Sequence, residues 1–251
     1  MDNYFEKEGY SVPKPISKYK TYGKVFFYFA IGIIIAGLVS LLFSNILYRY
    51  AFTDLNKFYN AYIIILGVSA LGMFITTLVI RLFSFKTGSG MIIPYILYSF
   101  FMGGILTGSL VFIGDPNILG TAFLVTALLF LLIGIVTILL GNKIKFIFVL
   151  LIGLIMGIGL LSLFNFLLLP FILINGEFYE NFKYLYFLLE IGIFLVTIIY
   201  TAVDLWRLNR AANTGAEITT NYALYLALNL LTDFIYIFIR IAVLIARLRR
   251  R

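Results

Sequence analysis

The last apolar segment, Asn221 to Ile245, constrains the fold most, because it can cross a bilayer yet carries charged side chains. Its length of about 25 residues suffices for a membrane-spanning helix, and Asp233 and Arg240 lie in or near its middle. A charge near the bilayer centre costs at least about 2.5 kcal/mol on insertion scales, so neither residue is expected to face lipid. At helical spacing, Asn229, Asp233, Tyr236 and Arg240 form one polar stripe. We therefore expect this helix to lie inside a ring of the other helices.

The composition predicts a polytopic membrane protein with one integral domain. Of the 251 residues, 63% are hydrophobic and 12% charged, whereas a soluble domain is nearer half apolar and a quarter charged. Histidine and cysteine are both absent, which excludes His or Cys metal sites, Ser-His or Cys-His nucleophile pairs and disulfides. The net charge of +8 lies mostly at the expected helix ends, where it indicates topology. We expect no nucleic-acid partner and no tightly bound cofactor.

Seven apolar segments predict an all-α fold with seven transmembrane helices, the last enclosed by the other six. Each is long enough to cross about 30 Å of hydrocarbon. Short links make consecutive helices antiparallel neighbours, and Gly103, Gly104 and Gly108 allow close helix packing. The expected division is a cytoplasmic N-terminal segment at 1–23, the transmembrane domain at 24–246 and a basic tail at 247–251. The segments are approximately 24–47, 61–83, 91–113, 118–140, 146–174, 184–205 and 222–246.

The distribution of lysine and arginine predicts a cytoplasmic N-terminus, because cytoplasmic loops carry the basic excess. The many aromatic and isoleucine residues and the lack of cysteine favour a bacterial cell membrane. The opposite loops hold only Arg49, Lys57 and Lys183. A full last span would place the basic tail outside, whereas a re-entrant last helix would return it; we expect the full span. The basic residues on the N-terminal side are Lys7, Lys14, Lys18, Lys20, Lys24, Arg81, Lys86, Lys143, Lys145, Arg207 and Arg210.

Three acidic residues within membrane segments are the candidate functional groups: Glu190, Asp204 and Asp233. Glu190 and Asp204 share one face of the sixth helix, and antiparallel packing brings Asp204 to a depth similar to that of Asp233. Two carboxylates close together in a low dielectric cannot both ionise easily, so the pair can share a proton or hold a cation between its oxygens. The alternative is a buried polar pair that only sets the helix register.

Glu190 and three further polar residues, Arg81, Asn229 and Arg240, are candidates for a latch, which is an ion pair that closes the pathway, or for the pathway itself. Arg81 ends the second helix on the side of Asp204, and it either pairs with Asp204 or Asp233 or marks topology by snorkelling. Asn229 lies one turn before Asp233 on the polar stripe, and Arg240 lies two turns after it.

Several of these stretches resemble the Bax inhibitor family of transmembrane Bax-inhibitor-motif proteins. Residues 227–239 are similar, without a gap, to the family's last helix, Ala-Leu-Ser-Leu-Tyr-Leu-Asp-Phe-Ile-Asn-Leu-Phe-Leu. Tyr200 and Asp204 match the family's Tyr-x-x-x-Asp pattern, and residues 121–130 resemble its Thr-Ala-Phe-x-x-Thr-Ala stretch. Tyr236 departs from the asparagine that usually follows the second aspartate, and the loop between the aspartates is a few residues longer.

The resemblance implies a bacterial-type pH-sensitive calcium leak channel in which Asp204 and Asp233 form the pH-sensing pair and contact calcium. It also implies a latch arginine in the second helix, for which Arg81 is the candidate. We expect a monomer in the lipid bilayer that passes calcium ions and responds to protons. A proton-coupled transporter and a non-transporting membrane regulator are alternatives. The sequence shows no inverted repeat of the kind that many secondary transporters have. An enzyme is not expected, because neither aspartate follows the Gly-x-Gly of membrane aspartyl proteases.

Overall fold

The computed structural model describes residues 18–84, 90–140, 176–214 and 217–249, and every regular element within these ranges is a helix. Each is long and apolar enough to cross a membrane. The predicted all-helical fold with membrane-length helices is therefore confirmed for the described residues. The expected span at 146–174 lies outside the described residues. The six described helices are α1 (Lys18–Thr53), α2 (Leu55–Phe83), α3 (Ile92–Ile113), α4 (Pro116–Leu140), α6 (Gly176–Asn213) and α7 (Thr220–Arg249).

Most of the described helices extend beyond the apolar segments from which they were predicted, and α3 is the exception. Helix α1 begins at Lys18, six positions before the expected boundary at 24, and α6 continues to Asn213 instead of ending near 205. A helix satisfies its own backbone hydrogen bonds, so leaving hydrocarbon for water does not require it to end. The apolar length thus marks the membrane-facing part of each helix and not its full extent.

The short connections follow ordinary capping chemistry. Asp54 separates α1 from α2, and its carboxylate accepts hydrogen bonds from the backbone N–H groups of Asn56 (3.0 Å) and Lys57 (3.2 Å). Gly114 ends α3 in the left-handed region (φ 63°), and its N–H donates to the carbonyl of Leu110. The connection at Gly114 is therefore a helix stop followed directly by the start of α4.

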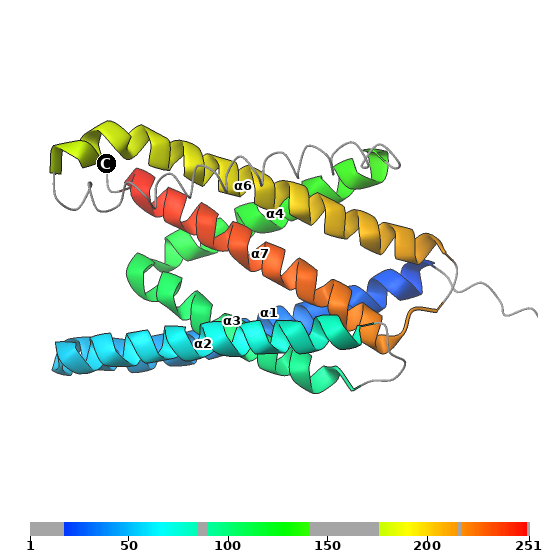
Figure 1. Cartoon of the computed structure of the whole chain (residues 1–251), viewed down its shortest axis with the longest axis horizontal. Coiled ribbons are helices and arrows are strands. Elements are labelled where there is room, and N and C mark those ends of the chain that lie inside the picture. Colours follow the sequence, from blue (N-terminus) through cyan, green and yellow to red (C-terminus); the bar gives the residue numbers. More distant parts are fainter. Residues whose placement is uncertain (1–17, 85–89, 141–175, 215–216, 250–251) are drawn as a thin grey trace, which may run out of the picture.

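Helix α7 lies at the centre of the described bundle (Figure 1) and contacts each of the other five described helices. In its most apolar stretch 61% of residues are buried, against at most 44% in any other described helix. The expectation of an enclosed last helix holds for these five neighbours. Burial shields Asn229 and Asp233 of the polar stripe from lipid, whereas Tyr236 is exposed and Arg240 is half-buried.

Helix α7 runs as one uninterrupted helix from one end of the bundle to the other (Figure 1). Its first turn lies near the start of α1 and the end of α6, and Arg249 at its far end forms an ion pair with Asp115 in the α3–α4 connection. Helix α7 is thus long and apolar enough for the predicted full span, and the choice between a full span and a re-entrant helix stays a prediction. The side of the membrane that each end faces stays a prediction.

Candidate functional site

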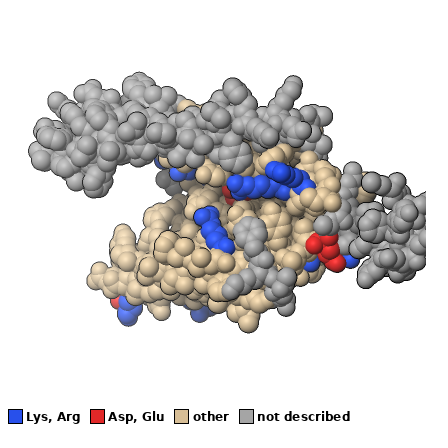
Figure 2. Space-filling view, turned by 45° about the vertical axis from the view of Figure 1, so that its right-hand side comes forward, with Lys and Arg blue, Asp and Glu red and all other residues tan. Residues whose placement is uncertain are grey.

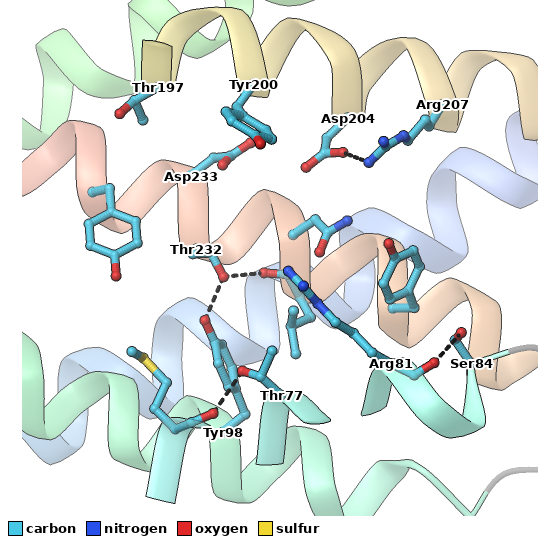
Figure 3. A pocket seen from close by; sticks show the side chains of 15 residues that line it. Thr77, Arg81, Ser84, Tyr98, Thr197, Tyr200, Asp204, Arg207, Thr232 and Asp233 are labelled. Carbon is cyan, nitrogen blue, oxygen red and sulfur yellow. Dashed lines mark hydrogen bonds and ion pairs between the residues drawn. The ribbon is translucent and has the colours of Figure 1, made fainter. Parts of the chain in front are cut away.

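A cavity of about 650 Å³ opens between α2, α3, α6 and α7, and we call it the aspartate cavity (Figure 3). Both sequence-predicted aspartates line it, Asp204 from α6 and Asp233 from α7. Most of its other lining side chains carry hydroxyl, amide or guanidinium groups. These polar residues are Thr77, Arg81, Ser84, Tyr98, Thr197, Tyr200, Arg207, Tyr225, Asn229, Thr232 and Tyr236.

Asp204 is buried and pairs with Arg207 one turn later on the same helix. The Nη1 atom of Arg207 donates to Oδ1 of Asp204 across 2.7 Å. The Asp204 side chain is 7% exposed, whereas that of Arg207 is 36% exposed, so the arginine reaches from the cavity toward solvent. A charge-assisted hydrogen bond at this distance offsets much of the cost of burying the carboxylate.

Asp233 is also buried, at 8% exposure, but its Oδ2 atom has no hydrogen-bond partner among the described residues. An unsatisfied buried carboxylate oxygen is costly and is normally found only where a proton, ion or water completes the site. No direct hydrogen bond joins the two aspartates within the described ranges; Asp204 is held by Arg207 instead. A contact between the aspartates through one water stays a prediction.

Arg81 reaches into the aspartate cavity from the last turn of α2 (Figure 3). It forms no ion pair with Asp204 or Asp233 in the part of the chain that the structure describes. The predicted latch is therefore not closed in this conformation, although Arg81 lies in the cavity where such a latch would act. Asn229 is buried and also lines this cavity.

Arg240 lies apart from the aspartates and lines a second, smaller cavity of about 170 Å³ between α6 and α7, together with Phe194 and Arg247. It makes no ion pair with Asp233 among the described residues, because two helical turns separate them on α7. The polar stripe of α7 thus divides between two cavities. Glu190 belongs to α6, but its side chain lies outside the described residues.

Two features of the aspartate cavity were missed from sequence. Arg207 was assigned only to topology, although a basic residue three positions after Asp204 is at pairing distance on a helix. The hydroxyl groups of Tyr98 on α3 and Thr232 on α7 share a hydrogen bond of 2.5 Å. No local pattern signals that bond, because 134 positions separate the two residues.

The cavity offers oxygen ligands but not a complete resident calcium site. Calcium takes about six to eight oxygen ligands, and the described residues contain no cluster of three or more metal-ligating acidic, histidine or cysteine side chains. The guanidinium groups of Arg81 and Arg207 line the cavity beside the carboxylates. In Figure 2, a basic group near the middle of one face largely hides an acidic one.

Comparison with known proteins gives one match. A family model described as Bax1-I, "Inhibitor of apoptosis-promoting Bax1", matches residues 19–250, which is nearly the whole chain. No curated protein and no solved structure matches this chain.

Proposed function

The chain belongs to the Bax inhibitor family of multi-pass membrane proteins, and on this premise we propose that it is a pH-sensitive calcium leak channel. The observation that carries the proposal is the aspartate cavity, in which buried Asp204 is paired and buried Asp233 keeps an oxygen without a partner among the described residues. Calcium is the transported ion and not a resident cofactor. No catalytic role is assigned to any residue.

Asp233 is the proposed acceptor of the incoming proton or cation. Its side chain lines the cavity, and its Oδ2 atom has no hydrogen bond from the described residues, so in this scheme a proton or a calcium ion supplies the missing interaction. Asp204 and Thr232 line the same cavity and offer further oxygen atoms. In this scheme, charged aspartates attract Arg81 and Arg207 and keep α2, α6 and α7 together, and protonation weakens that attraction.

The wider arrangement proposed here is a seven-helix monomer in the cell membrane, with residues 146–174 forming the remaining helix around α7. The N-terminus is proposed to be cytoplasmic. Basic residues near the start of α7 support this orientation, because Lys20 contacts Glu217, Lys24 contacts Ile218 and Arg210 lines a cavity with Tyr222.

A proton-coupled calcium transporter is the second candidate, and the Asp233 oxygen, which has no partner in the described ranges, favours it as well. A transporter moves calcium against its gradient when a proton gradient is imposed, whereas a leak only lets calcium run down its gradient. Proteoliposomes with an imposed pH difference and equal calcium on both sides separate the two. Net calcium accumulation would favour the transporter.

Calcium flux into proteoliposomes, measured between pH 5 and 8, tests the proposed leak. We expect the flux to change over about one to two pH units, as for a coupled pair of acids. Asp204→Asn and Asp233→Asn keep the side-chain shape but remove the charge change, so each should flatten the pH response. The double variant should add little to either single variant, because both act on one site.

The matched control is Asp54→Asn, a carboxylate at the α1–α2 connection that caps α2 and does not line the aspartate cavity. Asparagine also caps helices well, so this variant should keep the wild-type pH profile. If Asp204→Asn and Asp233→Asn keep that profile too, the aspartates are structural and the proposed mechanism fails.

A further inference from the structure

A separate cavity of about 570 Å³ lies where α6 ends and α7 begins, and we call it the interfacial cavity. Its lining includes Trp206, Arg207 and Arg210 from α6 and Tyr222 and Tyr225 from α7. Its volume lies within the usual range for small-molecule sites, about 300–1,000 Å³. Neither the family match nor the proposed leak gives it a role.

The interfacial cavity is positively charged. Its described lining holds two arginines and no acidic side chain. Glu217, in the short connection before α7, is already engaged at 3.5 Å by Lys20. Lys24 adds a further positive charge nearby, because its Nζ donates to the carbonyl of Ile218, another lining residue. An anion entering this cavity is attracted by Arg210 and Lys24, whereas the charge of Arg207 is largely offset by its ion pair with Asp204.

Arg210 is placed to bind such an anion. Its guanidinium lies over the Trp206 ring, with Cζ 5.6 Å from the ring centroid. Stacking on the ring orients the planar donor group without occupying its edge, and no carboxylate pairs with it in the described part of the chain. An arginine that is stacked on a ring and not paired with a carboxylate presents several N–H donors in a fork that matches phosphate oxygens.

The aromatic side chains form the rest of the wall. Tyr222 and Tyr225 stack with their ring centroids 6.2 Å apart, and both line the cavity beside Trp206. Tryptophan and tyrosine concentrate where hydrocarbon meets water, with the apolar ring on one side and the polar atom on the other. The cavity therefore combines phosphate-type donors with the side chains that mark a headgroup level.

We propose that the interfacial cavity is a binding site for a phosphate-bearing anion, held by Arg210 and oriented against Trp206. The phosphate belongs either to a lipid headgroup or to a free phosphate compound, and both share this chemistry. The site does not depend on the proposed calcium leak. It adjoins the aspartate cavity, because Arg207 and Tyr225 line both, so the test uses Arg210, which lines only the interfacial cavity.

Trp206 makes the test specific, because it is the only tryptophan in the chain. Its fluorescence is recorded on the purified full-length protein in two arms. In the first arm, inorganic phosphate is titrated into protein held in phosphatidylcholine nanodiscs. In the second, phosphatidylglycerol replaces a rising share of the phosphatidylcholine. We expect a saturable change in one arm, and that arm identifies the source of the phosphate.

Arg210→Gln should raise the amount of phosphate or phosphatidylglycerol needed for half-saturation at least tenfold, and Arg210→Lys should raise it less. The half-saturation point is compared and not the amplitude, because Arg210 itself lies beside the fluorophore. Arg49→Gln, an exposed arginine of α1 outside this cavity, is the control and should titrate like the wild type. Circular dichroism checks that each variant is folded.

Three results would overturn the proposal. One is the absence of a saturable change in both arms. Another is an equal change produced by sodium chloride at matched ionic strength, which would indicate general screening. The third is a folded Arg210→Gln variant with the wild-type half-saturation point.

Discussion

Asp204 and Arg207 lie one turn apart on α6, and their 2.7 Å contact is the one ion pair of the aspartate cavity among the described residues. Replacing Arg207 by Gln leaves the Asp204 carboxylate buried without its cationic partner, which disfavours the charged form. If the proposed leak is correct, Arg207→Gln should move the pH midpoint of calcium flux by about one unit toward higher pH. Flux measured against pH in proteoliposomes checks this.

The comparison variant is Arg81→Ala, which removes the sequence-predicted latch from the same cavity. Removal of a latch should raise the leak at neutral pH, because the charged aspartates no longer hold α2 against α6 and α7. An unchanged leak would leave Arg81 as a topology marker. A pH midpoint that Arg207→Gln does not move would show that the Asp204–Arg207 pair plays no part in gating.

Among the elements, α1 and α3 pack so closely that one added methyl group has no room. A Cβ on Gly103 of α3 would lie 2.6 Å from the backbone oxygen of Ala36 and 2.8 Å from Cβ of Val39, both in α1. Gly103→Ala should therefore push the helices apart and cost about 1–3 kcal/mol, a typical penalty for overpacking. Thermal unfolding of the detergent-solubilised protein should show a lower midpoint than the wild type.

The control is Gly120→Ala in α4, where an added Cβ meets nothing within 4 Å. Alanine favours a helix over glycine by up to about 1 kcal/mol, so this variant should unfold at or slightly above the wild-type midpoint. Equal midpoints for the two variants would mean that the α1–α3 contact adjusts without cost.

For the whole molecule, the continuous α7 and its terminal ion pair place the two ends of the described chain at opposite ends of the bundle. Arg249 pairs with Asp115 at one end, and α1 begins at the other (Figure 1). With a cytoplasmic N-terminus, a cysteine at Arg251 should therefore react with an impermeant thiol reagent on intact cells. The chain has no cysteine of its own, so the introduced one is the only target.

Asn213→Cys, at the exposed end of α6 on the opposite side, should react only after permeabilisation. The reverse labelling of the two variants would invert the proposed orientation. Labelling of both from the same side would contradict a full span of α7.

The sequence alone determined the helical class, six of the membrane-length segments and the burial of the last helix. These follow from local or unavoidable costs: hydrocarbon requires long apolar helices, and Asp233 cannot face lipid. The end of α3 and the start of α4 also follow from local chemistry, because a left-handed glycine and a capping aspartate act within a few residues. The meeting of Asp204 and Asp233 in one cavity was predictable as well, because a short connection makes their two helices antiparallel neighbours.

Only the tertiary structure decided which partners those side chains meet. Arg207 and not Arg81 pairs with Asp204, Arg240 turns to another cavity, and Tyr98 bonds Thr232 across 134 positions. Each outcome depends on how far a helix is rotated and shifted against its neighbours. Periodicity states which residues share a face, but packing of all the surrounding side chains sets which face meets which neighbour.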